Sequence, residues 1–250
     1  MIGPLAYIGG KNRLAKQIIS VFPKHTTYVE AFAGGAQVFF HKPPSEVEVL
    51  NDLDGEICNF FRVCQWHHDE LLRHLRYCLA SRKLYEITAA SDPAILTDVQ
   101  RAARFFYLQK NSFGGLVVKQ SYHFTVGSTP NYNPERLPEV LENTYKRLQH
   151  VQIESLPYEK ILTQYDRPET LFYLDPPYWG RKLYRFNFEP EDFRVLAERL
   201  TQIKGRFVLS LNDLPEVRET FKAFQIQGFS AAYSAQKKSD KRYGELLITN

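Results

Sequence analysis

Residues 26–54 read TTYVEAFAGGAQVFFHKPPSEVEVLNDLD, and this stretch predicts the fold class of the chain. Its first seven residues are rich in β-branched and aromatic side chains, which favour a strand, and they run into a turn that contains Gly34 and Gly35. A short apolar stretch follows, and residues 46–54 form a second candidate strand that ends in acids, Asp52 among them. Strand, glycine turn, helix, strand and acid together outline a nucleotide-binding βαβ unit.

The composition indicates one sizeable core with at most a smaller appended domain, because 44% of the 250 residues are hydrophobic. A formal net charge of +4 is only weak evidence for an anionic partner. The three cysteines form no common zinc spacing, and their odd number argues against a disulfide framework. The first residues lack the apolar core of a signal peptide, and no apolar run approaches the roughly 20 residues of a membrane span. We therefore expect a cytoplasmic protein with reduced thiols.

The α/β rhythm of the first fifty residues returns near Val151, after a block with helical periodicity and charged faces. Further strands are expected at 171–175, 206–213 and 245–250, and further helices at 12–22 and 191–203. We predict an α/β sheet with helices on both faces, formed by residues 1–56 and 150–250. Residues 57–149 are predicted to form a mostly helical insert.

Three of the expected strand ends carry unusual residues: Glu30–Gly35, Asn51–Asp54 and Asp175–Trp179. In an open parallel sheet the carboxyl ends of the strands lie at one edge, where ligands bind, so these segments should cluster in space. The glycine pair lets a backbone approach a ligand closely, although an ordinary strand-to-helix turn would use it too. Asp52 lies at the position of an acid that accepts hydrogen bonds from ribose hydroxyls, and a helix cap is the alternative.

The segment 171–179, LFYLDPPYW, ends a buried strand in an acid, two prolines and two aromatics. The prolines fix two φ angles and remove two backbone donors, so the turn is stiff and its carbonyls remain free to face a ligand. Asp175 and these carbonyls offer acceptors for the two hydrogens of an exocyclic amino group, and Tyr178 offers a flat ring. Holding both hydrogens would orient a poorly nucleophilic aromatic amine for attack.

Four motifs in this order carry a family resemblance: YIGGKNRL (7–14), YVEAFAGGAQVFF (28–40), VLNDLDGEI (49–57) and LFYLDPPYW. The chain resembles the D12 class of DNA N6-adenine methyltransferases, the Dam-like group with an Asp-Pro-Pro-Tyr motif. The resemblance implies a Rossmann-like fold and site-specific methylation of double-stranded DNA. It further implies S-adenosyl-L-methionine as the cofactor and an adenine flipped out of the duplex, because N6 cannot be reached inside the stack.

The resemblance also assigns site residues. Asp175 and the Pro176 carbonyl would hold the amino group, and Tyr178 would stack on the adenine. The implied catalytic residues are Asp175, Pro176, Pro177 and Tyr178, and the implied cofactor-binding residues are Tyr7, Lys11, Glu30, Phe32, Gly34, Gly35, Asp52, Ser155, Leu156 and Asp175. The final glycine of the family's Phe-x-Gly-x-Gly motif is Ala36 in this chain.

Residues 99–134 of the insert contain no acid, which suits contact with phosphates and base edges. The predicted DNA contacts are Lys110, Asn111, Ser112, Phe113, Lys119, Tyr122 and His123. Family members that read GATC carry Asn-Gly-Leu-x-Arg, whereas this chain has Val118 at the arginine position, so GATC is not the expected site. Residues 237–242, KKSDKR, are a second basic candidate with a solvated loop as the alternative.

Several readings stay open beside this one. N4-cytosine methylation is an alternative, because it also modifies an exocyclic amino group, but such enzymes usually carry serine at the position of Asp175. RNA is a possible substrate, and an inactive DNA-binding paralogue would lose the site motifs that this chain retains. An ATP-binding loop at IGGKN fails the spacing of the phosphate-loop pattern. No metal and no obligate protein partner are expected, and a monomer suits the family. The sequence leaves open which DNA site is recognised, whether a cognate restriction enzyme exists, and whether the origin is bacterial or viral.

Overall fold

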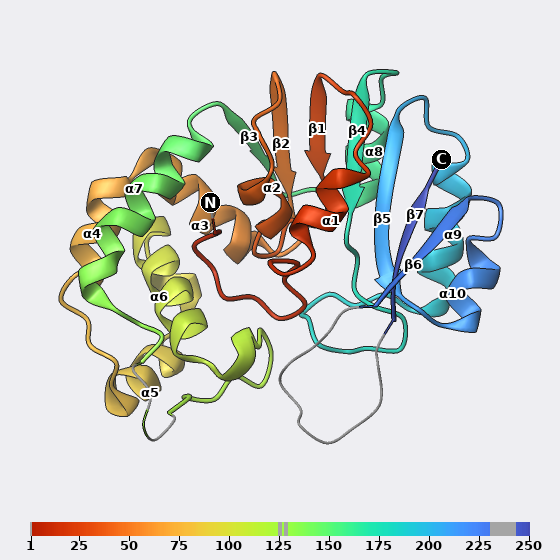
Figure 1. Ribbon diagram of the computed structural model, residues 1–250. Helices are drawn as coiled ribbons and strands as arrows, with labels where there is room; N and C mark the ends of the chain where they lie inside the picture. The colour runs from red at the N-terminus through yellow and green to blue at the C-terminus, as the bar shows by residue number, and fades with distance from the viewer. Residues whose placement is uncertain (1, 125–126, 128–129, 231–243) are drawn as a thin grey trace.

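The computed structural model describes residues 2–124, 127, 130–230 and 244–250, and a seven-stranded sheet lies at its centre (Figure 1). The strand order is β3-β2-β1-β4-β5-β7-β6. The strands are β1 (Thr27–Glu30), β2 (Val47–Asn51), β3 (Val151–Glu154), β4 (Thr170–Leu174), β5 (Arg206–Asn212), β6 (Gln225–Ser230) and β7 (Gly244–Thr249). β1 to β5 run parallel, and β7 runs antiparallel to both of its neighbours.

Alternation along the strands divides the buried side chains between the two faces of the sheet. All five residues of β4 are buried, as expected for a central parallel strand that is covered on both sides. One face carries Tyr28, Tyr173, Val208 and Leu247, and the other carries Val29, Phe172, Leu209 and Ile248. The polar residues of the candidate site lie on the first of these two faces, at the carboxyl ends of the strands.

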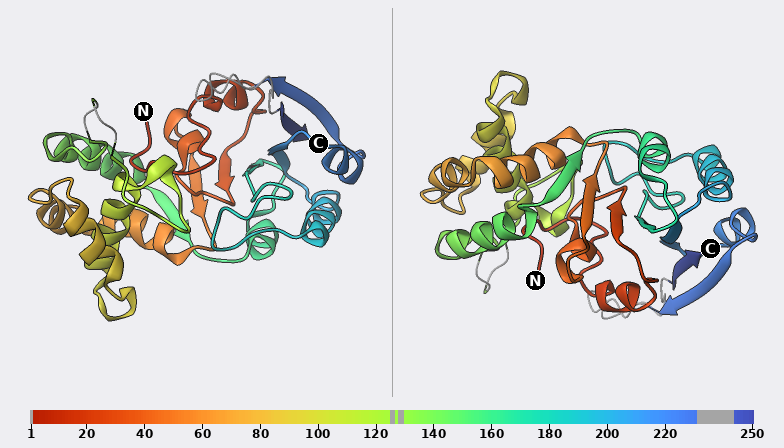
Figure 2. Two further views of the ribbon diagram at one scale, coloured as in Figure 1. Left: turned by 90° about the horizontal axis from the view of Figure 1, so that it is seen from below. Right: turned by 90° about the horizontal axis from the view of Figure 1, so that it is seen from above.

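Helices cover both faces of the sheet (Figure 2). The first face packs on α1 (Ala15–Ser20), α2 (Gln37–His41) and α3 (Gly55–Trp66). The second face packs on α8 (Tyr158–Tyr165), α9 (Pro190–Leu200) and α10 (Pro215–Thr220). The predicted fold class, a Rossmann-like α/β sheet with helices on both faces, is confirmed.

The segment predicted as an insert contains α4 (His68–Leu75), α5 (Arg82–Ala90), α6 (Asp98–Asn111) and α7 (Leu137–Leu148). Short 3₁₀ turns lie at Pro93–Ile95, Phe113–Gly115 and Pro134–Arg136. These helices stand beside the β3 edge of the sheet (Figure 1), and their buried residues join the cluster of the first sheet face. Stacking of Phe60 of α3 on Phe106 of α6, with ring centroids 5.5 Å apart, is part of that continuous core. The division into a catalytic domain and a separate insert therefore stays a prediction.

The strand order indicates where on the sheet a ligand is expected to bind. From β1 the sheet grows in one direction through β2 to β3 and in the other through β4 to β5, so the connections change direction between β1 and β4. Ligands of open α/β sheets bind at such a switch point, beyond the carboxyl ends of the strands. The basic segment 237–242 lies outside the described residues. In the described part of the chain, no helix is long and apolar enough to cross a membrane.

Candidate functional site

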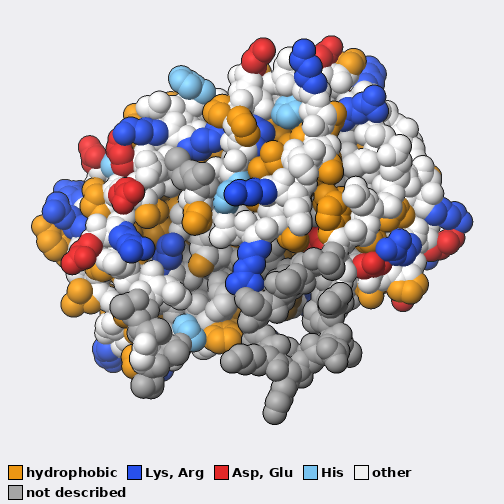
Figure 3. Space-filling model, viewed as in Figure 1, with side chains coloured by type: hydrophobic (Ala, Val, Ile, Leu, Met, Phe, Trp, Pro, Cys, Tyr) orange, Lys and Arg blue, Asp and Glu red, His pale blue; other side chains and the backbone are white. Residues whose placement is uncertain are grey.

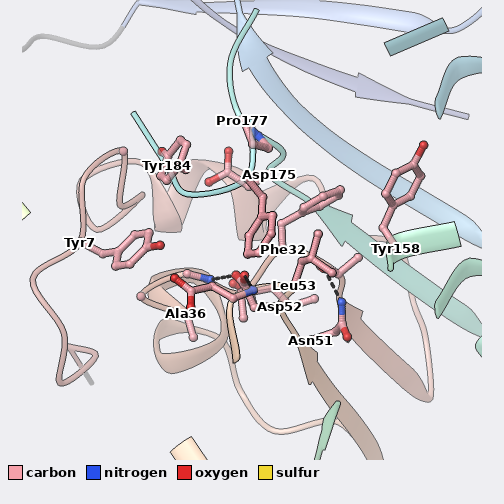
Figure 4. A pocket seen from close by; sticks show the side chains of 18 of the residues that line it. Tyr7, Phe32, Ala36, Asn51, Asp52, Leu53, Tyr158, Asp175, Pro177 and Tyr184 are labelled. Atoms are coloured by element: carbon pink, nitrogen blue, oxygen red, sulfur yellow. Dashed lines mark hydrogen bonds between the residues drawn. The ribbon is translucent and has the colours of Figure 1, made fainter. Parts of the chain in front are cut away.

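A cavity of about 500 Å³ opens beyond the carboxyl ends of β1, β2 and β4, at this switch point (Figure 4). Residues of all three strand-end segments line this cavity, as the sequence analysis predicted. Ten of the predicted site residues line it: Tyr7, Lys11, Glu30, Phe32, Gly34, Gly35, Asp52, Leu156, Asp175 and Pro177. Ser155, Pro176 and Tyr178 are not among its lining residues.

The glycine turn after β1 makes room for an aromatic side chain. A Cβ atom on Gly34 would lie 3.1 Å from the ring of Tyr7, and one on Gly35 would lie 2.9 Å from the Tyr7 Cβ. Ala36, at the position of the motif's final glycine, adopts a left-handed conformation with φ of 49°. A non-glycine residue in this conformation costs roughly 1–2 kcal/mol.

Asp52 joins the end of β2 to the glycine turn. Its Oδ2 accepts from the Gly34 amide at 2.8 Å, and its Oδ1 accepts from the Asp54 amide, also at 2.8 Å. Burial raises the pKa of Asp52 to about 6, although these amides oppose the shift. The helix cap is instead Asp54, whose carboxylate accepts from the Glu56 amide at the start of α3. The Leu53 amide also interacts with this carboxylate, so one of its four acceptor positions remains for a ligand of the cavity.

Lys11 and Asp175 form a buried ion pair between the N-terminal segment and the end of β4. The Lys11 Nζ lies 2.7 and 2.8 Å from the two Asp175 carboxylate oxygens, and only 4% of Lys11 is exposed. Burial disfavours the ammonium, but Asp175 and then Glu245 outweigh it and raise the pKa of Lys11 above its ordinary value. The Ser210 hydroxyl also donates to Asp175 Oδ1 at 2.8 Å. Oδ1 is thus filled, and Oδ2 retains one acceptor position.

Glu30 lies beneath this pair, with 2% of its surface exposed. Its Oε2 accepts from the Tyr28 hydroxyl at 2.7 Å and from the Phe39 amide at 3.1 Å, which fastens β1 to α2. Burial raises the pKa of Glu30 to about 8, and the nearby Asp175 adds to the rise. The raised pKa favours the protonated form of the Glu30 carboxyl closer to neutral pH than is usual for a glutamate.

Residues 175–179, which we call the proline turn, are held by side chains that the sequence analysis did not single out. Asn212 of β5 accepts from the Trp179 amide at 3.1 Å and donates to its carbonyl at 3.2 Å. The Tyr178 hydroxyl donates to Glu245 of β7. Strand alternation was the available signal, because Ser210 and Asn212 lie two residues apart and so on one face, with Glu245 opposite Asn212.

The outer wall of the cavity comes from the irregular segment after the proline turn. The Tyr184 ring lies nearly parallel to that of Tyr7, with centroids 6.1 Å apart, and its hydroxyl donates to the Ile8 carbonyl at 3.2 Å. Arg185 pairs with Asp54 at 2.9 Å. The sequence analysis missed these two residues, since a lone tyrosine and arginine in a loop carry no spacing signal.

Comparison with known proteins agrees with this geometry. Residues 7–235 match the model of the D12 class N6 adenine-specific DNA methyltransferases. The chain belongs to this family. Over 98% of its length it is 28% identical to the type II methyltransferase M1.LlaDCHI of Lactococcus lactis subsp. cremoris, of which it covers 93%.

Two viral relatives match over less of their own length. The type II methyltransferase M.CviBI of Paramecium bursaria Chlorella virus NC1A is 28% identical over 68% of this chain and 66% of that protein. The DNA N-6-adenine-methyltransferase of Escherichia phage P1 is 26% identical over 94% of this chain and 33% of that protein. The predicted family and enzyme class, an adenine-specific DNA methyltransferase, are therefore confirmed.

The methyltransferase carries its predicted DNA contacts on and beside residues 111–124, which we call the insert loop. Two of them face inward: Asn111 donates to the Tyr107 carbonyl at 2.8 Å, and Ser112 donates to the Leu108 carbonyl at 2.7 Å. Only 4% and 2% of their surfaces are exposed. Both side chains satisfy carbonyls of the last turn of α6, so in this conformation they support the loop and offer no surface to DNA.

The other predicted contacts of the methyltransferase are accessible. Phe113 is 58% exposed, and Lys119 is exposed with φ of 51°. Lys110, Tyr122 and His123 are half-buried. On the face seen in Figure 3, the charged side chains near the middle are mainly Lys and Arg, whereas Lys, Arg, Asp and Glu all lie nearer the periphery. DNA contact by the insert loop stays a prediction.

Proposed function

We propose that this protein transfers the methyl group of S-adenosyl-L-methionine to the N6 amino group of adenine in double-stranded DNA, at a specific site. Family membership supports adenine methylation of DNA. The observation that carries the finer statement is Asp175, a carboxylate fixed by Lys11 and Ser210 that keeps one acceptor position at the cavity.

The cavity suits the proposed cofactor in volume and in chemistry. About 500 Å³ is within the range of roughly 300–1,000 Å³ that small-molecule sites occupy. Asp52 offers carboxylate oxygens to ribose hydroxyls, and Phe32 and Leu156 provide apolar walls for a purine. The Asp52 carboxylate favours a cationic ligand such as a sulfonium, whereas the charge of Asp175 is offset by Lys11. Tyr7 and Lys11 line the same space from the N-terminal segment.

The bound cofactor would supply an electrophilic methyl group on a sulfonium, and the chain's own residues would prepare the amine. Asp175 Oδ2 would accept one N–H of the adenine amino group, and the Pro176 carbonyl would accept the other. Because Lys11 and Ser210 already fix the carboxylate, no reorganisation is needed when the amine arrives. Drawing on both hydrogens favours the tetrahedral nitrogen that attack requires.

The adenine would have to leave the duplex to reach Asp175, which is only partly exposed. Tyr178 is the predicted stacking partner, and its ring is held in place through its hydroxyl. The accessible residues of the insert loop, Phe113 and Lys119 foremost, would contact the DNA beside the site. Asn111 and Ser112 would act indirectly by shaping that loop.

The decisive experiment is methylation of unmethylated genomic DNA by the purified protein, followed by modification-sensitive sequencing. We expect N6-methyladenine at one short motif other than GATC, because Val118 replaces the arginine that reads GATC. The Asp175→Ala variant, prepared in parallel, excludes a contaminating enzyme and should give no modified base. N4-methylcytosine, modification of RNA alone, or full activity of Asp175→Ala would overturn the proposal.

A further inference from the structure

Glu245 is a buried carboxylate in the strand next to the proline turn, and the methylation chemistry described above gives it no role. It is the second residue of β7, in the sequence GELLIT, and 4% of it is exposed. A carboxylate in such a strand is costly unless it is paired and hydrogen-bonded. Lys11 supplies the charge at 3.6 Å, and the Tyr178 hydroxyl supplies the hydrogen bond.

Three polar side chains of β5 and β7 form hydrogen bonds with the proline turn. Ser210 holds the Asp175 carboxylate, and Asn212 holds the backbone of Trp179 on both its amide and its carbonyl. Glu245 holds the Tyr178 ring, and it lies opposite Asn212 in the antiparallel pairing. Each supporting side chain therefore acts on a different part of the turn.

The contact of Glu245 determines the orientation of a ring. A tyrosine side chain has two torsion angles, so a hydrogen bond at its far end fixes the plane of the ring as well as its position. The Lys11 ammonium lies over the Tyr178 ring, 4.7 Å from its centroid, which restricts the ring further. Without the Glu245 acceptor, the buried Tyr178 hydroxyl would lose its hydrogen-bond partner, and the ring would be free to rotate away.

We propose that Glu245 is a positioning residue, which acts on methyl transfer by holding the Tyr178 ring in the orientation that receives the target base. This rests on the proposed function, in which Tyr178 stacks on the adenine. Glu245 need not touch substrate or cofactor, because it is not among the residues that line the cavity. Its effect should therefore fall on the rate of transfer and not on cofactor affinity.

A double-mutant cycle tests this inference with Glu245→Gln, Tyr178→Phe and the double variant. Glutamine keeps the size of the side chain and weakens the acceptor, and phenylalanine keeps the ring and removes the hydroxyl. We expect Glu245→Gln to slow single-turnover methylation about 10- to 100-fold, since small misplacements at a reacting centre have effects of this size. Cofactor affinity should stay within about twofold, and Glu245→Gln should have little further effect in the Tyr178→Phe background. Glu216→Gln, an exposed change of the same charge, is the matched control.

A second measurement separates this inference from the proposed function. In protein labelled with 3-fluorotyrosine, the ¹⁹F signal of Tyr178 is the one that Tyr178→Phe removes. Glu245→Gln should shift or broaden that signal, while Glu216→Gln should leave it unchanged. An unchanged signal overturns the inference even if the protein methylates no DNA, and so does an undiminished rate effect of Glu245→Gln in the Tyr178→Phe background. An inactive wild-type protein with a shifted signal would overturn only the proposed function.

Discussion

The proline turn and the insert loop both follow the end of a buried element, but their side chains are used in opposite ways. In the proline turn, Lys11, Ser210, Asn212 and Glu245 fix the carboxylate, the backbone and the ring. The insert loop is pinned at its base by inward-facing side chains and by backbone pairing of Ser112 with Tyr122, whereas Phe113 and Lys119 are exposed. Chemistry at one atom requires preorganisation, whereas contact with a duplex requires accessible and adjustable side chains.

The largest expected effect comes from removing the cation that holds the proline turn. Lys11→Met leaves Asp175 and Glu245 without their shared buried cation, so the Asp175 carboxylate would lose the contact that orients it. We expect single-turnover methylation to fall at least about 100-fold. Lys16→Met, an exposed change on α1, is the control and should leave the rate within about twofold. A Lys11→Met rate near that of the wild type would show that the turn is organised without Lys11.

A second prediction concerns pH and cofactor affinity. The pKa of Asp52 is raised to about 6, so the carboxylate gains a proton as the pH falls through 6 and loses acceptor capacity for the ribose hydroxyls. The dissociation constant of S-adenosylmethionine should therefore rise as the pH falls, to about tenfold above its neutral value at pH 5. Titration calorimetry from pH 5 to 7.5 would measure it. Asp52→Asn should bind weakly at every pH, and the same slope in that variant would assign the titration to another group.

The proline turn and the glycine turn could be predicted from sequence because each depends on residues that are adjacent in the chain. Segment 26–54 carried strand, turn and acid in one stretch, and the structure places Gly34 and Asp52 in direct hydrogen-bond contact. Glu245 could not be predicted this way. Its contact with Tyr178 depends on β7 being inserted antiparallel beside β5, and nothing in the local pattern of β7 fixes that neighbour.

In the insert loop, the local sequence was consistent with two different arrangements of the side chains. Asn111 and Ser112 are short polar residues at the end of a helix, a pattern that is equally consistent with contact to DNA and with satisfaction of the last helical carbonyls. The structure has the second arrangement, since both side chains bond carbonyls four residues earlier. Within the block of helical periodicity, α3 and α4 are separated at His67, where the backbone leaves the helical region. Both outcomes depend on tertiary packing that the local sequence does not specify.

The insert loop is joined to the N-terminal segment, which carries Tyr7 and Lys11, by the fully buried Gln109. Its amide nitrogen donates to the Ala6 carbonyl at 2.7 Å and to the Gly115 carbonyl at 2.6 Å, so it joins the segment that carries Tyr7 to the insert loop. Gln109→Leu leaves these carbonyls short of a donor, at about 1–3 kcal/mol for a buried group. We expect several-fold weaker binding of both S-adenosylmethionine and DNA, together with a lower melting temperature.

The control for Gln109 is its neighbour Gln120. Gln120 donates to the Gln109 side chain at 3.0 Å and to the Leu116 carbonyl at 2.7 Å, and both of these contacts lie within the insert. Gln120→Ala should therefore weaken DNA binding without changing cofactor affinity. Equal changes in cofactor affinity for the two variants would mean that Gln109 does not connect the regions in the way its hydrogen bonds suggest.

The smallest expected effect is at Lys119, on the exposed side of the insert loop. If its ammonium meets a phosphate, Lys119→Ala should weaken binding of any duplex a few-fold at low salt and reduce the slope of log affinity against log salt by about 1. Cofactor affinity and the preferred methylation motif should not change, because a phosphate contact positions the protein without reading bases. Lys119→Arg keeps the charge and should keep the slope. An altered motif in Lys119→Ala would instead show that this side chain reads a base edge, and an unchanged slope would place it outside the interface.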